Sequence, residues 1–244
     1  IAINSKIIFK LIDKTKFAIS NEETRYFLNG LYFNITKNQS NSVVTLVGTD
    51  GHRLSKFSHN IDDSIDQVSG VIIPKKTIYE LSKLLSEIDQ DVFISISSNK
   101  IVFNINNIIF ISKLIDGSFP DYERVIPKDN SNILKINREI LLSAVDRVST
   151  IANEKSPVIK FKLLHNVLNL NTINNESSTA SEDLRINYSG DEIEIGFNSK
   201  YIMDIVNNLG DEEISINLKD NTSPIIALEN SNSNLVYVLM PMRV

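Results

Sequence analysis

The chain has 244 residues, 42% of them hydrophobic, with a formal net charge of −5 and no cysteine. The length suits one large domain or two ordinary ones, and the lack of cysteine excludes disulfides and thiolate metal sites. No apolar run reaches the roughly 18 residues that a membrane span needs. A negative net charge argues against a protein that is basic throughout, so nucleic-acid binding would need a local basic patch. We expect a soluble, cytoplasmic protein.

The first half of the sequence predicts two helices and several short strands. Apolar residues recur at helical spacing from Lys6 to Ile19, and Pro74 is placed to begin a second helix. Asn29-Gly30 and Asp50-Gly51 each separate two apolar runs, which is the strongest short signal for a β-hairpin. Three further runs alternate with period two and predict strands: DVFISISS, KIVFNI and IIFISKLID.

The second half repeats this order of elements. Asn137 can cap a third helix, turns are expected at His165-Asn166 and Gly190-Asp191, and a fourth helix should run from Ser199 to Leu209. A repeat of roughly 125 residues predicts two similar α+β domains, each with two helices on antiparallel strands. We place these domains at residues 1–128 and 129–244, joined by the polar segment Pro127–Asn132.

The stretch TDGHR, Thr49–Arg53, is the first candidate for chemistry. Asp50 and His52 could form an acid–base pair beside an anion-holding Arg53. A two-residue turn would send Asp50 and His52 to opposite ends of the loop, however, and no nucleophile is fixed beside them. A structural turn is therefore favoured, with a hydrolase as the alternative. His59 and His165 lack the spacing of metal ligands, and no glycine-rich phosphate loop occurs, so we expect no catalytic residue, metal or cofactor.

Cationic residues occur on all four predicted helices. On the first helix, Lys6, Lys10 and Lys14 follow each other at intervals of four, which places them in one line. A single line of this kind is usually a solvated face. Four helices with cations on a potential common face would attract a phosphate backbone without reading base sequence. The remaining cations on these helices are Lys16, Lys75, Lys76, Lys83, Arg138, Arg147 and Lys200.

Two apolar segments are unusual for their positions. GSFPDYERVIP lies between the predicted domains, and the sequence ends in YVLMPMRV, although chain ends are commonly polar. Methionines on both sides of a proline suit an adaptable apolar groove for a partner peptide. The alternative is a last core strand with an apolar tail.

These segments together resemble the bacterial sliding clamp family, the beta subunit of DNA polymerase III. The matching stretches occur in the family's order and extend over essentially the whole chain. The resemblance implies the middle and last of the family's three clamp domains and a non-catalytic replication factor, and the first domain is expected to be absent, in agreement with the start at Ile1. The stretches are RYFLNGLYF, TDGHRL, FISKLIDGSFPDYERVIP, NEK, YSGDEIEIGFNSKY and YVLMPMRV.

The resemblance implies a pocket between the two domains that accepts short peptides. The expected peptides belong to the polymerase III alpha subunit, the clamp loader, other polymerases and mismatch-repair proteins. Two residues depart from the family: Val244, where leucine is frequent, and Phe27, where a second tyrosine is frequent. The residues that the resemblance assigns to this pocket are Leu28, Thr49, Gly51, His52, Arg53, Leu54, Pro120, Arg124, Val125, Asn198, Tyr201, Val238, Met240, Pro241, Met242 and Arg243.

The resemblance further implies helices that line a closed ring around duplex DNA, formed by a homodimer of the full-length protein. Weak, salt-screened contacts would then suffice, because the ring holds the DNA topologically. A complete two-domain ring that closes as a trimer is the second alternative. The residues expected to contact DNA are Lys6, Lys10, Lys14, Tyr26, Phe27, Lys75, Lys76, Arg138 and Lys200.

Overall fold

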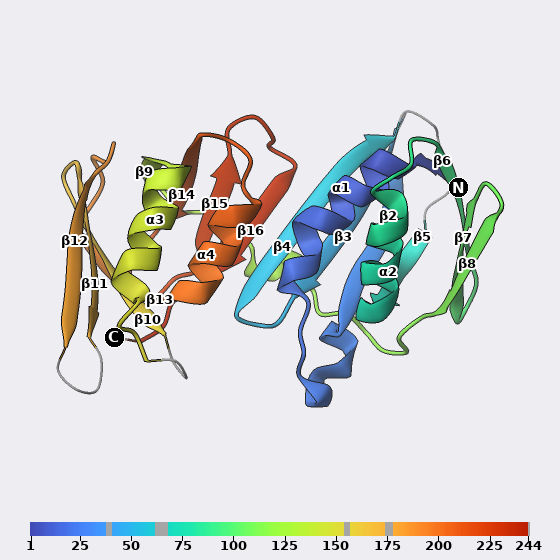
Figure 1. The fold of residues 1–244 in the computed structure, drawn as a ribbon, viewed down its shortest axis with the longest axis horizontal. Helices are drawn as coiled ribbons and strands as arrows, with labels where there is room; N and C mark the ends of the chain where they lie inside the picture. Colours follow the sequence, from blue (N-terminus) through green and yellow to red (C-terminus); the bar gives the residue numbers. More distant parts are fainter. Residues whose placement is uncertain (38–40, 62–67, 154–156, 174–177, 244) are drawn as a thin grey trace. The chain divides into compact units, whose positions relative to one another are not determined.

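The computed structural model describes residues 1–37, 41–61, 68–153, 157–173 and 178–243 (Figure 1). It divides into two compact units, Ile1–Pro120 and Asp121–Val244. The boundary predicted after residue 128 falls inside the second unit. Two features singled out in the sequence, the last two residues of NEK and Val244, lie outside the described residues.

The first unit consists of two antiparallel sheets and two helices. One sheet has the strand order β1-β6-β7-β8 and the other has β5-β2-β3-β4. Helices α1 and α2 contact each other and lie side by side against the strands (Figure 1). The elements are β1 (Ala2–Asn4), α1 (Ser5–Thr15), β2 (Gly30–Lys37), β3 (Ser42–Thr49), β4 (Arg53–Ile61), β5 (Val68–Pro74), α2 (Lys75–Leu85), β6 (Asp91–Ile96), β7 (Lys100–Ile105) and β8 (Ile108–Lys113).

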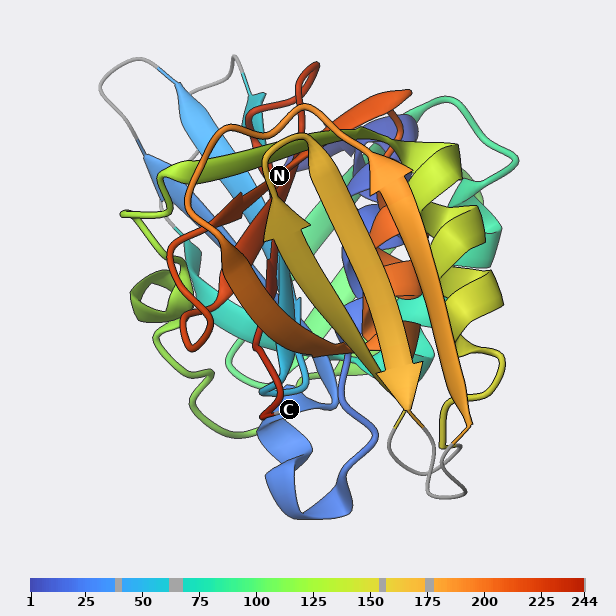
Figure 2. The same ribbon diagram turned by 90° about the vertical axis from the view of Figure 1, so that its left-hand side faces the viewer.

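The second unit repeats this topology strand for strand. Its sheets have the orders β9-β14-β15-β16 and β13-β10-β11-β12, and Figure 2 faces the second of these. The predicted α+β class and the domain-scale repeat are thereby confirmed. The elements are β9 (Asn132–Asn137), α3 (Arg138–Ser149), β10 (Val158–Leu164), β11 (Val167–Ile173), β12 (Thr179–Arg185), β13 (Ile193–Asn198), α4 (Ser199–Asn208), β14 (Glu213–Leu218), β15 (Ile225–Glu229) and β16 (Leu235–Leu239).

The helices form where the apolar period and a capping side chain coincide. In α1, Ile8, Leu11 and Ile12 are buried against the strands, and the Asn4 side chain accepts the backbone N–H of Lys6 at 2.9 Å. The helix ends at Thr15, four residues before the predicted end. There the Thr15 hydroxyl donates to the carbonyl of Leu11 at 2.7 Å, and a 3₁₀ turn follows.

The hairpin predicted at Asn29-Gly30 is wrong, and the turn predicted at Gly190-Asp191 does not join two paired strands. Before Asn29 the chain forms a 3₁₀ segment, Glu23–Leu28, and β2 begins at Gly30 and pairs with β3 and β5. Gly30 meets β5 so closely that a Cβ atom there would lie 2.2 Å from the carbonyl oxygen of Ile73. Around Gly190-Asp191, the strands β12 and β13 stand at opposite edges of their sheet and do not pair.

Three strands were not predicted from the sequence. β1 has only three residues, and β5 ends at Pro74, which the sequence analysis assigned to a helix start. β9 begins inside the predicted linker. Its first residue, Asn132, donates to the carbonyl of Lys219 at 3.1 Å and accepts the N–H of Asp191 at 3.0 Å, so contacts distant in sequence fix this strand.

The loop between β14 and β15 is held by one carboxylate, Asp220. Backbone and hydroxyl donors of Thr222 and Ser223 converge on it at 2.7 to 3.0 Å. These hydrogen bonds, those from Thr222 first, lower the pKa of Asp220 from its ordinary 3.8 to about 2. A depressed pKa stabilises the folded protein at pH values above 3.8, and this stabilisation is lost as the pH falls toward 2.

Replacing Asp220 by asparagine should therefore lower the urea midpoint of unfolding at pH 5, and the difference from wild type should shrink between pH 4 and pH 2. The amide keeps the shape of the side chain but removes the charge that strengthens these hydrogen bonds. The matched control is Asp116→Asn, at an exposed carboxylate with no hydrogen bond or ion pair among the described residues. A difference for Asp220→Asn that is constant with pH would contradict this account.

No described helix is long and apolar enough to cross a membrane.

Candidate functional site

The TDGHR turn links β3 to β4, as predicted, but as a three-residue loop. β3 ends at Thr49 and β4 begins at Arg53, so residues 50–52 form the connection. The Asp50 carboxylate accepts the backbone N–H groups of His52 and Arg53 at 2.9 and 3.0 Å. The Thr49 side chain donates to the Arg53 carbonyl at 2.6 Å and accepts the N–H of Gly51 at 3.1 Å. Side chains of the turn thus satisfy its own backbone.

Arg53 is held inside the first unit. Its Nε donates to Asp50 at 3.1 Å, its Nη2 donates to the carbonyl of Phe17 at 2.9 Å, and the guanidinium lies 5.3 Å from the centre of the Phe17 ring. Only 10% of the Arg53 side chain and 14% of the Asp50 side chain are exposed. Both Asp50 oxygens are engaged by Arg53 or by backbone donors. This arrangement favours a rigid turn over the acid–base pair considered from the sequence.

Arg25 of the 3₁₀ segment covers the turn at Gly51. Gly51 has a φ of +88°, and a Cβ atom there would lie 2.4 Å from Nη1 of Arg25. Glu22 accepts Nε of Arg25 at 2.6 Å. Hydrogen bonds from Thr24 and then Arg25 lower the pKa of Glu22. Sequence reasoning missed this contact, because nothing local relates Arg25 to a turn 26 residues later (51 − 25).

The predicted pocket residues of the first unit differ in exposure. Gly51, His52 and Pro120 are exposed. Leu28, Thr49 and Leu54 are buried, so they would support a binding surface from beneath. Phe119, which precedes Pro120, stacks on Tyr32 with the ring centres 5.0 Å apart. That stacking anchors the end of the first unit to β2.

In the second unit, the C-terminal tail lies along β13. After β16 ends at Leu239, the N–H of Met242 donates to the carbonyl of Gly196 at 2.8 Å. Met240 has 37% of its surface exposed, Pro241 and Met242 are half-buried, and Arg243 is exposed. Val238, which the resemblance also assigns to the pocket, lies before the tail and is buried within β16. The tail therefore has one fixed backbone contact and presents its first methionine to solvent.

Asn198 and Tyr201 lie where β13 passes into α4. Asn198 ends β13 and caps α4, because its side-chain oxygen accepts the N–H groups of Lys200 at 3.0 Å and Tyr201 at 3.4 Å. Elsewhere in the unit, Val125 is 41% exposed and Arg124 pairs with Asp121 at 2.7 Å on a 3₁₀ turn. Asn198 thus belongs to the strand that the tail contacts at Gly196, whereas the first unit holds its own group around the turn.

The predicted DNA-contacting cations differ in how far they are neutralised. Lys6 pairs with Asp89 at 2.5 Å and Arg138 pairs with Glu139. Lys75 donates to Asn21 and lies 5.7 Å from the centre of the Tyr79 ring, and Lys14 is half-buried. Three exposed lysines form no ion pair among the described residues: Lys10, Lys76 and Lys200.

Tyr26 and Phe27 belong to the 3₁₀ segment and not to the hairpin expected from the sequence. Their rings meet edge to face at 5.8 Å. Tyr26 is 54% exposed and Phe27 is half-buried. A Cβ atom at Gly117 would lie 3.3 Å from Cβ of Phe27 and 3.5 Å from the Tyr26 ring. Tyr26 is thus available for an external contact, with Phe27 as its support.

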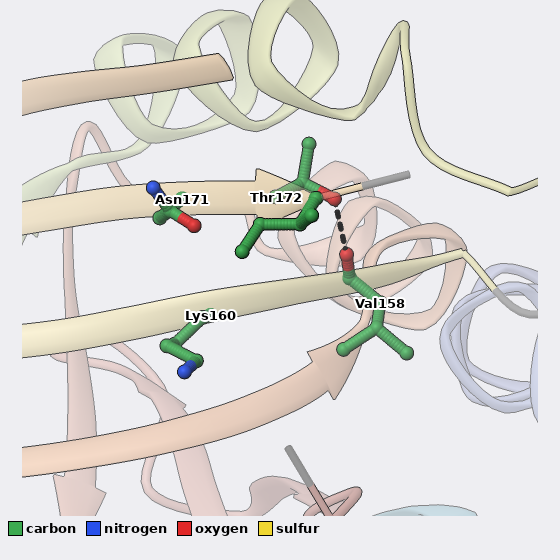
Figure 3. A pocket seen from close by; sticks show the side chains of 5 residues that line it. Val158, Lys160, Asn171 and Thr172 are labelled. Carbon is green, nitrogen blue, oxygen red and sulfur yellow. Dashed lines mark hydrogen bonds between the residues drawn. The ribbon is translucent and has the colours of Figure 1, made fainter. Parts of the chain in front are cut away.

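Metal-binding clusters of three or more histidine or acidic residues do not occur in the described part of the chain. A surface hollow of about 200 Å³ lies on β10 and β11, lined by Val158, Lys160, Asn171, Thr172 and Ile173 (Figure 3). Lys160 pairs with Glu194 at 2.8 Å, and Thr172 donates to the carbonyl of Val158 at 2.6 Å. No predicted site residue lines this hollow, and two of its polar side chains, Lys160 and Thr172, already have partners.

Comparison with known proteins assigns both units to one family. The central-domain model of the DNA polymerase III beta subunit matches residues 2–121, and the C-terminal-domain model matches residues 123–243. The beta sliding clamp of Caulobacter vibrioides is 38% identical over the whole chain. This chain spans 66% of the length of that relative.

Solved structures give the same result. A sliding clamp from Bartonella birtlesii bound to griselimycin is 44% identical with a TM-score of 0.96, and the match covers 100% of this chain and 66% of that one. A beta sliding clamp from Caulobacter crescentus with bound PEG is 38% identical, also with a TM-score of 0.96, over 100% and 65% of the two chains. The chain therefore belongs to the bacterial sliding clamp family, the beta subunit of DNA polymerase III, and comprises that family's central and C-terminal domains.

Proposed function

We propose that this chain serves as part of a sliding clamp, a non-catalytic processivity factor that encircles duplex DNA in the bacterial cytoplasm and tethers the replication machinery to it. Family membership over the whole chain is the observation that carries this proposal. The full-length protein would close as a homodimer ring. The phosphate backbone would be attracted mainly by Lys10, Lys76 and Lys200, whose charges no described carboxylate neutralises.

The proposed partner site combines the TDGHR turn of the first unit with the tail of the second. The turn is made rigid by Asp50 and Arg53, and an ordered surface lowers the entropic cost of binding a flexible peptide. The tail offers Met240, a side chain that adapts to different apolar partners. The proposed ligands are short apolar peptides of the polymerase III alpha subunit, the clamp loader, other polymerases and mismatch-repair proteins.

Primer extension tests the processivity function. The product of the natural reading frame that contains this sequence, together with clamp loader and polymerase III core, should lengthen the DNA made in each binding event. The polymerase core with loader but without this protein is the control. Product lengths that do not change on addition of the protein would refute the proposal.

A further inference from the structure

The outer face of the sheet β1-β6-β7-β8 carries large apolar side chains in solvent. Phe93 on β6 is 57% exposed, and Ile109 and Ile111 on β8 are 67% and 61% exposed. The strand register places them in two neighbouring rows, because Phe93 pairs with Asn104 and Asn104 with Ile109, while Val102 pairs with Ile111. Alternate residues of these strands face the core, so the exposed ones form one contiguous face.

One end of this face carries an uncompensated positive charge. Lys100 and Lys113 are directly opposite each other on β7 and β8, both exposed. Like charges at directly opposed positions destabilise a sheet, and neither lysine has an ion pair or hydrogen bond from its side chain among the described residues. Asp91, at the start of β6, is exposed beyond Phe93 at the other end. The face is therefore apolar in the middle, basic at one end and acidic at the other.

We propose that this face, defined by Phe93, Ile109, Ile111, Lys100 and Lys113, binds an amphipathic helix of a partner protein whose acidic end lies over the two lysines. Contiguous apolar patches in solvent mark interaction sites, and the open face of a sheet is commonly covered by helices. Carboxylates in the last turns of the helix, together with the negative end of its dipole, complement the lysine pair. The surface shares no residue with the peptide pocket or the DNA-facing lysines, so it does not depend on the proposed function.

A fluorescein-labelled synthetic helix of about five turns, with a leucine stripe and glutamates in its last two turns, is the probe. Fluorescence anisotropy measures its binding to the full product of the natural reading frame. Phe93→Thr with Ile111→Thr should weaken binding at least about tenfold, because threonine keeps strand propensity but removes apolar area. Lys100→Glu with Lys113→Glu should have a similar effect and reverse the salt dependence, because salt screens the new repulsion.

Matched controls lie on the other unit, where Ile173 is 64% exposed and Lys162 is exposed on β10. Ile173→Thr and Lys162→Glu should leave binding unchanged. A probe with lysines in place of its glutamates should bind the wild type at least about tenfold more weakly than the acidic probe. Its affinity should be restored when it binds the Lys100→Glu, Lys113→Glu variant. This recovery shows that the variant is folded.

Four results would overturn the proposal. The first is equal binding of the acidic and basic probes to the wild type. The second is binding that neither pair of substitutions changes. The third is no binding of the probe by the full product. The fourth is a concentration-dependent dimer in sedimentation that Phe93→Thr with Ile111→Thr abolishes, since the face would then belong to a second copy of the chain.

Discussion

Replacing Met240 by alanine should weaken the binding of a short apolar peptide from the polymerase III alpha subunit about tenfold. We expect the wild-type affinity to be about micromolar, or about −8 kcal/mol, because a flexible peptide must be ordered on binding. Met240 follows β16 directly and has 37% of its surface exposed, so it can contact a ligand without leaving the fold. Truncation of a central interface side chain costs more than about 1 kcal/mol. Isothermal titration calorimetry gives both affinities.

Ile173→Ala is the matched control for Met240→Ala. It also truncates an exposed apolar side chain in the second unit, far along the chain from the tail, and should leave peptide affinity unchanged. Leu54→Asp is a weaker test, because Leu54 is buried and the charge would destabilise the first unit itself. Equal affinities of wild type and Met240→Ala would show that the tail is not part of the peptide site.

Replacing Lys10 and Lys76 together by glutamate should weaken DNA binding to a similar extent for every sequence tested. Both lysines are exposed on helices that contact each other, α1 and α2, and neither forms an ion pair among the described residues. Each neutralised phosphate releases about one counterion, so the slope of log affinity against log salt should fall by roughly two. Peptide affinity should not change, because the sites share no side chain.

Lys100→Glu with Lys113→Glu supplies the control, since it changes the net charge equally but acts on a sheet face. It should leave the salt slope of DNA binding unchanged in the full-length ring. If both double variants lower the affinity alike, the effect is one of net charge. If Lys10→Glu with Lys76→Glu keeps the wild-type slope, these lysines are an ordinary solvated helix face.

Local patterns predicted much of this fold. The α1 and α2 helices, the β6–β8 strands and the repeat of the whole order follow from periods that a few neighbouring residues establish. The prediction of a hairpin at Asn29-Gly30 was wrong, because a 3₁₀ segment and not a strand precedes β2. In this segment Arg25 is held by Glu22. The sequence did not predict β9, because this strand is fixed by contacts of Asn132 with Lys219 and Asp191. Local sequence does not reveal such contacts.

In the candidate site too, local features were predictable from sequence and contacts between distant residues were not. The turn at Asp50-Gly51 was predictable from sequence, and the resemblance supplied the residues around it. The internal role of Arg53 was not predictable, because its partner Phe17 lies 36 residues away in the chain. Similarly, only the structure distinguishes the cations that form ion pairs from those that do not. Lys6 pairs with Asp89 and Arg138 pairs with Glu139. Among the described residues, no ion pair is formed by Lys10, Lys76 or Lys200.

The most direct test of the sliding-clamp assignment is retention on DNA of different topology. The full product of the natural reading frame is loaded by the clamp loader onto nicked circular DNA, and the complex is separated by gel filtration at high salt. The protein should stay with the circle and be lost after a restriction enzyme linearises it, because a closed ring is held by topology and not by affinity. Equal retention on circular and linear DNA, or loss from both, would contradict the assignment.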